Sequence, residues 1–196
     1  MTLWKRRVAK YTRWLHIYGS MASFVIVFFF AITGITLNHP EWFAAERITQ
    51  AKGHLDPAWT NPAANEVSKR EIASFLQQTH RLGGAPSDIR VDDQQCTVSF
   101  RGPGYTADVF IDRRTGDYAL TETRLGLVAI INDLHKGRDT GAIWKAVIDI
   151  SAALLVFISI TGIVLIWFVH KHRVAGIVLL ILGGIVSAFC YAMWVP

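Results

Sequence analysis

Three long apolar runs dominate the hydrophobic pattern of this 196-residue chain. They lie at 14–38, 141–169 and 174–195, and each exceeds the length of about 20 residues that an α-helix needs to cross a bilayer. Pro40 follows the first run, and the basic segment 170–173 separates the second run from the third. The pattern therefore predicts three transmembrane helices, the last two joined as a hairpin.

The segment between the first two runs, residues 39–140, has a different pattern. Apolar residues recur at helical spacing over 66–80, which predicts an amphipathic helix closed by the glycine pair at 83–84. A shorter amphipathic helix is predicted over 125–134. Apolar positions are few in 40–64, so we expect an irregular linker there.

Strands are expected in the middle of the same segment. Apolar and polar residues alternate over 96–100 and 107–111, and glycine and proline at 102–104 form a turn signal between them. A helix followed by paired strands predicts a small α+β domain. The expected fold class is thus an integral membrane α-helical protein with three transmembrane helices and one small α+β domain.

The 20 Lys and Arg residues are distributed unevenly along the chain. Seven of them lie in the short segments 1–13 and 170–173, whereas residues 40–140 hold 12 Lys and Arg against 14 Asp and Glu. By the positive-inside rule the two basic segments face the cytoplasm, so the α+β domain and the C-terminus are expected outside it. The slight acidic excess of the domain also removes the main argument for nucleic-acid binding.

Several chemistries have no support in the sequence. No GxSxG, HExxH or CxxC motif occurs, and the two cysteines, Cys96 and Cys190, are far apart. Asp149 is the one acidic residue within a predicted span, whereas a transporter usually has several charged residues along its pathway through the membrane. We therefore assign no catalytic residue, and neither hydrolysis nor transport is favoured.

Four of the seven histidines fall at the ends of the predicted spans. His16 and His170 lie at the cytoplasmic side, although His172 is an alternative to His170, and His39 and His135 lie at the outer side. A single histidine at headgroup depth can simply be hydrated. Two facing pairs, by contrast, favour a bound ligand.

A short internal sequence repeat supports this pairing of histidines. Residues 31–37 and 159–165 both contain Ile-Thr-Gly-Ile, in helices expected to run in opposite directions. An inverted repeat of this kind would place His16 near His170 and His39 near His135. The alternative is that Thr-Gly only lets neighbouring helices approach closely.

Two neutral imidazoles facing across a gap between helices could bind a b-type haem. One or two haem b groups are expected, with His16, His39, His135 and His170 as the iron ligands. Gly19 and Gly34 could make room for the macrocycle. Nearby cations suit haem propionates or phospholipid headgroups, and these are Arg13, Arg173, Lys136 and Arg138.

Several segments together resemble the PepSY-associated transmembrane helix family. They are Trp14–His16, Ile32–Ile35, Leu37–His39, Leu134–Gly141 and Ile160–Ile163. The predicted helix, the two strands and the turn at 111–117 resemble a PepSY module. The resemblance covers most of the chain apart from 40–64 and the third run.

This resemblance implies a function in electron transfer. Larger members are similar to inner-membrane reductases that free iron from ferric siderophores in the periplasm, with haem held by membrane histidines. The chain is then expected in a bacterial inner membrane, with its N-terminus cytoplasmic and its main domain and C-terminus periplasmic. It would be a haem-dependent oxidoreductase of the ferric-reductase kind.

The resemblance also suggests partners and leaves one alternative open. Besides the lipid bilayer, the expected partners are a ferric siderophore or iron-uptake components. The larger members have at least four spans, so a homodimer or a related membrane subunit would complete the pathway across the membrane. The alternative function is a non-enzymic, membrane-anchored PepSY module that binds a partner while its helices serve only as anchors.

Overall fold

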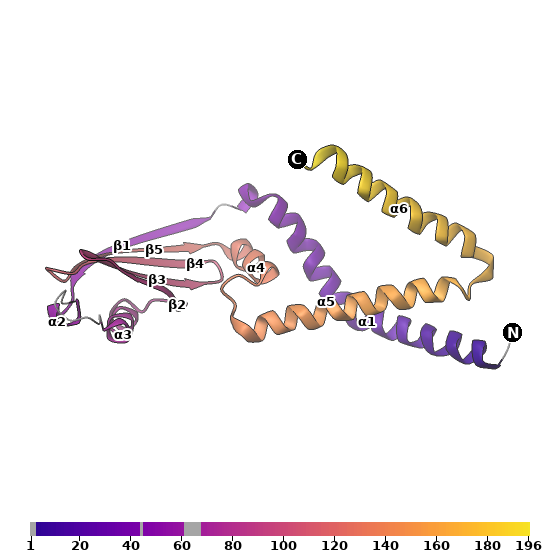
Figure 1. The fold of residues 1–196 in the computed structure, drawn as a ribbon, viewed down its shortest axis with the longest axis horizontal. Helices are drawn as coiled ribbons and strands as arrows, with labels where there is room; N and C mark the ends of the chain where they lie inside the picture. The colour runs from indigo at the N-terminus through magenta and orange to yellow at the C-terminus, as the bar shows by residue number, and fades with distance from the viewer. Residues whose placement is uncertain (1–2, 44, 61–67) are drawn as a thin grey trace. The chain divides into compact units, whose positions relative to one another are not determined.

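The computed structural model describes residues 3–43, 45–60 and 68–196, apart from the side chains of Pro57 and His170. The chain divides into two compact units. One comprises Met1–Phe28 and Asp149–Pro196, and the other comprises Phe29–Ile148. Figure 1 shows the elements of both units.

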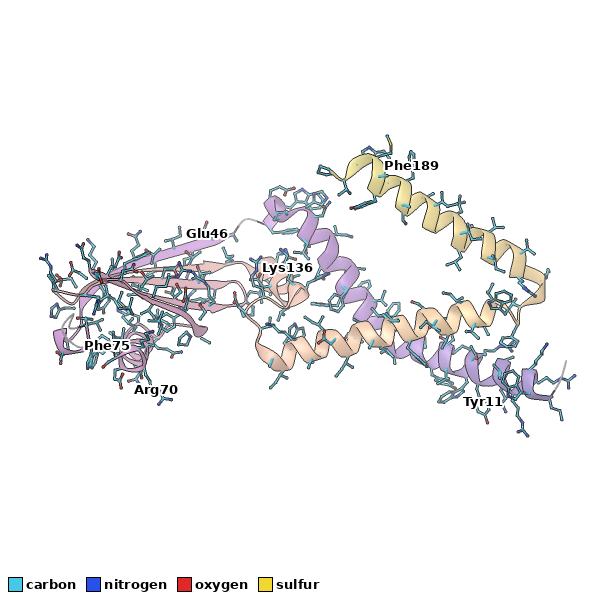
Figure 2. All side chains as sticks on the ribbon, viewed as in Figure 1. Tyr11, Glu46, Arg70, Phe75, Lys136 and Phe189 are labelled. Atoms are coloured by element: carbon cyan, nitrogen blue, oxygen red, sulfur yellow. The ribbon has the colours of Figure 1, made fainter. Side chains whose placement is uncertain are left out.

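Three helices are long and apolar enough to cross a membrane, as the hydrophobic pattern predicts. They are α1 (Leu3–Asn38), α5 (Gly141–Ile166) and α6 (Arg173–Trp194). No residue of α6 is buried within the chain, and its side chains are mostly hydrocarbon (Figure 2). Such a surface is stable in contact with lipid, so the chain is a membrane protein.

Helix α1 begins at Leu3 rather than at Trp14, because the basic N-terminal segment is helical as well. Lys and Arg are good helix formers, and neither glycine nor proline interrupts this segment. A helix of 36 residues is about 54 Å long at about 1.5 Å per residue. It therefore exceeds the hydrocarbon core of about 30 Å by several turns.

The unit Phe29–Ile148 contains a five-stranded antiparallel sheet in the order β1-β5-β4-β3-β2 (Figure 1). Four strands form a meander, and the first strand returns to pair with the last. The strands are β1 (Glu46–His54), β2 (Ala85–Val91), β3 (Gln95–Gly102), β4 (Tyr105–Asp112) and β5 (Asp117–Leu125). The predicted pair of strands is confirmed as β3 and β4.

The helix α3 (Lys69–His80) covers one face of the sheet and supplies Ile72 and Leu76 to its core. Both side chains are fully buried, as are Val98 and Phe100 from the sheet. Alternation along the strands sends these residues to one face, which explains why a domain of this size has a continuous apolar core.

The predicted irregular linker over 40–64 is wrong, because this stretch contains β1 as well as the short helices η1 (Pro40–Phe43) and α2 (Pro57–Thr60). Most side chains of β1 are exposed on both faces, so the strand lacks the apolar alternation on which the prediction depended. Its stability comes from pairing with β5, a contact that the local pattern does not reveal.

Both predicted amphipathic helices exist, with shifted ends. The described part of the first is α3, and residues 61–67, where its expected start falls, lie outside the described residues. It ends before Arg81, whose φ of 51° is left-handed, so the glycine pair at 83–84 does not close it. The second is α4 (Leu127–Lys136), which ends at Gly137 with φ of 67°.

Replacing Phe100 by alanine tests the assigned core. Phe100 is fully buried, so F100A should lower the free energy of unfolding of the sheet domain by about 3–5 kcal/mol. Urea denaturation of the full chain in detergent measures this change. F110A is the control, because Phe110 on the neighbouring strand is 47% exposed. Equal losses in the two variants would contradict the assigned core.

Candidate functional site

His16 projects from α1 onto α5 within the unit that contains both segments. Its Nδ1 lies 3.0 Å from Thr161 Oγ1 and 3.3 Å from the carbonyl oxygen of Ile158. The Thr161 hydroxyl itself donates to the Ile158 carbonyl at 2.7 Å, so its proton is already engaged. Nδ1 of His16 must then be the donor, and in the neutral imidazole this leaves a lone pair on Nε2.

Gly162 makes room for this imidazole. A Cβ at Gly162 would lie 3.1 Å from Cε1 of His16, closer than ordinary van der Waals contact. The two glycines expected to serve haem differ from it. A Cβ at Gly19 would meet Ile158 at 3.2 Å, and one at Gly34 would have no neighbour within 4 Å. The close approach around His16 therefore depends on Gly162.

His135 has an equivalent arrangement in the other unit. Its Nδ1, on α4, lies 2.5 Å from Thr33 Oγ1 on α1. Thr33 is almost fully buried and donates its proton to the Phe29 carbonyl at 2.7 Å. The His135 Nδ1–H is therefore the donor, and again Nε2 retains the lone pair. The edge of the Phe30 ring packs on the imidazole, with ring centroids 4.8 Å apart.

Polar contacts on both sides of His135 fix α4. Asn132 accepts a hydrogen bond from Thr36 Oγ1 at 2.6 Å and donates to the Thr36 carbonyl at 3.4 Å. Asp133 accepts the backbone N–H of Gly104 at 2.8 Å, between strands β3 and β4. The helix that carries His135 is thus bonded both to α1 and to the sheet, so the imidazole has a defined direction.

The surroundings of His135 favour its neutral form. Burial and the neighbouring Lys136 ammonium together hold the pKa of the imidazole below its ordinary value of 6.5. Only a neutral imidazole can act as a metal ligand. The neutral form of His135, with Nδ1 bonded to Thr33, could therefore ligate a metal through Nε2.

Thr33 and Thr161 contact the two histidines, and the sequence did not single them out as candidate site residues. Each is the threonine of an Ile-Thr-Gly-Ile repeat, and each holds a histidine from another helix. The repeated Ile-Thr-Gly-Ile sequence was the signal that could have identified them, since a threonine that recurs in a repeat can accept the same hydrogen bond at both places. Helix packing alone does not account for these two bonds.

His39 has local partners in the structure. Its ring stacks on Trp42, with centroids 3.9 Å apart and an interplanar angle of 5°. Its Nδ1 lies 3.3 Å from Glu41 Oε1. Within residues 29–43 and the described remainder of that unit, no contact joins His39 to His135, so their pairing stays a prediction.

The pairing of His16 with His170 also stays a prediction. The side chain of His170 lies outside the described residues. His172, the alternative ligand, is exposed at the end of η2 (His170–His172).

The four predicted propionate partners have varied surroundings. Arg173 stacks on Trp167 at 4.4 Å, and Arg138 lies 3.9 Å from an Asp133 carboxylate oxygen. Lys136 and Arg138 line a cavity of about 340 Å³ together with Arg101. Arg13 lines a separate groove on α1. Lys136 and Arg13 thus have no carboxylate within ion-pair distance among the described residues.

The lowered pKa of His135 predicts acid sensitivity. As the pH falls through 6.5, the unfolded chain binds a proton before the folded chain does, so stability decreases until the folded imidazole also titrates. Thermal unfolding of H135Q in detergent between about pH 7.5 and 5.5 should show a smaller decrease than the wild type.

H54Q is the control, because His54 is exposed and bonded to Asp117 on the sheet. H54Q should lose the same stability as the wild type over this pH range. Acid sensitivity that is unchanged in H135Q would contradict the neutral assignment of His135.

Comparison with known proteins places the chain in a family. No curated protein and no solved structure matches it. A sequence model of the family described as PepSY_TM-like matches residues 10–196, nearly the whole chain. The match includes both histidines that are bonded to threonine and the whole sheet domain, and it confirms the resemblance stated from the motifs. The chain belongs to the PepSY_TM-like family.

Proposed function

We propose that this protein binds haem and transfers electrons in the membrane, with His16 and His135 each presenting Nε2 to the iron of a b-type haem. The repeated histidine–threonine bond carries the proposal. Histidines that ligate metals almost always donate their second ring N–H to an oxygen acceptor, which fixes the tautomer and the ring orientation. Both histidines have this arrangement.

The residues around the two histidines fit such a group. The flat macrocycle needs an apolar setting, and His16 and His135 lie at helices whose neighbouring side chains are largely apolar. Bound haem iron would alternate between the ferric and ferrous states and so carry one electron at a time. Thr161 and Thr33 would raise the basicity of the two imidazoles and hold their direction.

The second iron ligands and the direction of transfer extend the proposal. His170 or His172 would complete the site of His16, and His39 would complete that of His135 after leaving Trp42. Electrons would pass from the cytoplasmic side of a bacterial inner membrane to a ferric siderophore or another ferric acceptor in the periplasm. A homodimer or a related membrane subunit would supply the further helices needed to complete the electron pathway across the membrane.

A non-enzymic binding module is the second candidate. The observation that favours it is the cavity of about 340 Å³, whose lining includes Arg101, Tyr105 and Asp133 but none of the four histidines. In that case the sheet domain would bind a partner and the helices would serve as anchors. The two candidates differ in whether the purified protein binds haem.

An absorption spectrum tests the proposal directly. The purified full chain, oxidised and then reduced with dithionite, should show a Soret band and sharp α-bands. H16A and H135A should each remove part of the signal, and the double variant should remove nearly all of it. H54A is the control and should keep the wild-type spectrum, because His54 is bonded to Asp117 on the sheet.

A wild-type protein that stays colourless after haem is added would contradict haem binding. It would leave the anchored binding module as the better explanation. A full spectrum in the H16A/H135A double variant would instead contradict the assigned ligands.

The threonines have their own test. T161V keeps the shape of the side chain but removes the acceptor for His16, so haem affinity at that site should fall about 10–100-fold. Haem titration of the apoprotein measures it. S159A is the matched control, since Ser159 lies on the same helix and bonds only its own helix carbonyl at Leu155. Equal affinities in T161V and S159A would contradict a ligand-orienting role.

A further inference from the structure

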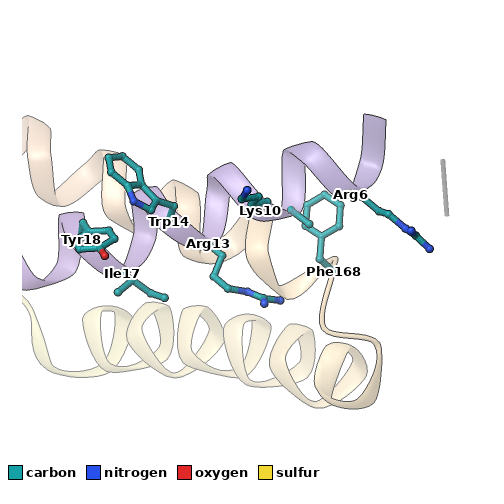
Figure 3. A pocket seen from close by; sticks show the side chains of 8 residues that line it. Arg6, Lys10, Arg13, Trp14, Ile17, Tyr18 and Phe168 are labelled. Carbon is teal, nitrogen blue, oxygen red and sulfur yellow. The ribbon is translucent and has the colours of Figure 1, made fainter. Parts of the chain in front are cut away.

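The first turns of α1 form a groove with the chain segment that follows α5. The groove has a volume of about 470 Å³ and lies within the unit of Met1–Phe28 and Asp149–Pro196. Figure 3 shows its labelled side chains. The lining residues are Arg6, Ala9, Lys10, Arg13, Trp14, Ile17, Tyr18 and Phe168. His16 is not among them, so the groove is distinct from the proposed haem ligands.

One end of the groove is strongly cationic. Arg6, Lys10 and Arg13 are spaced by four and three residues, which places them on one face of α1. Among the described residues no carboxylate lies within ion-pair distance of any of the three. Like charges at this spacing repel each other, so an anion bound between them would be favoured by all three.

The other end of the groove is aromatic and apolar. The rings of Trp14 and Tyr18 lie one turn apart with centroids 5.1 Å from each other. Ile17 completes this end, whereas Phe168 lies nearer Lys10 and Arg6 (Figure 3). Tryptophan and tyrosine are typical of the boundary between headgroups and acyl chains. The groove therefore changes from charged to apolar along α1, as an amphiphilic ligand would require.

The length of α1 agrees with a position at the membrane surface. Its 36 residues exceed what the hydrocarbon core needs, so the basic turns extend beyond that core. The phosphates of lipid headgroups lie just outside the hydrocarbon core, at the same depth as these basic turns. Basic pockets beside membrane helices are known to bind anionic headgroups.

We propose that this groove binds one anionic phospholipid, with its phosphate between Arg6, Lys10 and Arg13 and the start of its acyl chains along Trp14 and Ile17. The occupant is a lipid rather than free phosphate, because half of the lining is apolar. This proposal does not depend on haem binding, so the two can fail separately.

Native mass spectrometry of the full chain in detergent tests the proposal. The probes are phosphatidylglycerol and phosphatidylcholine with identical acyl chains. Wild type should retain phosphatidylglycerol preferentially. R6Q/K10Q/R13Q should reduce that retention by at least about tenfold, since each cation near the surface contributes about fivefold.

K5Q/R7Q/K171Q is the matched control, because it removes the same charge from residues that do not line the groove. It should lower phosphatidylglycerol retention less than the groove variant does, because general attraction to an anionic lipid is lost in both variants. An equal loss in the control would show general charge attraction and overturn the proposal. Absence of any preference for phosphatidylglycerol in wild type would also overturn it.

Two further measurements separate the parts of the groove. W14A keeps every charge and should still weaken lipid retention, whereas unchanged retention would overturn the assigned acyl-chain end. Phosphatidylglycerol should stay bound in excess inorganic phosphate. Its displacement would show that the groove recognises phosphate without the acyl chains, and this would overturn the proposal of a lipid site. If the triple variant does not fold, R6Q and K10Q singly should each lower retention about fivefold.

Discussion

The hydrogen bond between a helix threonine and a histidine from another helix is the constraint on which this structure depends. In an apolar setting each hydroxyl proton needs an acceptor, and Thr33 and Thr161 donate theirs to their own helix carbonyls. Their oxygens can then only accept. The imidazoles of His16 and His135 must donate from Nδ1, so the chain fixes the tautomer of both rings and leaves Nε2 available.

The elements around each bond serve to keep it in place. In one unit, Gly162 lets the His16 ring approach α5. In the other, α4 is bonded to the sheet through Asp133 and Gly104 and to α1 through Asn132 and Thr36. The direction of the His135 ring therefore depends on the packing of the sheet domain, which gives that domain a positioning role as well as any binding role.

The sequence predicted the three apolar helices well, because length and hydropathy alone decide which segments can cross a membrane. It missed β1, since an edge strand that is polar on both faces has no local signal. The partners of His16 and His135 are 145 and 102 residues away in sequence, beyond any local pattern, although the repeated Ile-Thr-Gly-Ile indicated their location. His39 contacts Trp42 and Glu41 locally, and its pairing with His135, suggested by the repeat, stays a prediction.

The most direct measurement of the central claim is electron paramagnetic resonance of the haem-loaded full chain, produced with isotope-labelled histidine. We expect low-spin ferric haem whose iron couples to labelled histidine nitrogen, with the coupling altered in T33V and T161V. Haem iron without coupling to histidine nitrogen would contradict it, as would coupling that neither threonine variant changes.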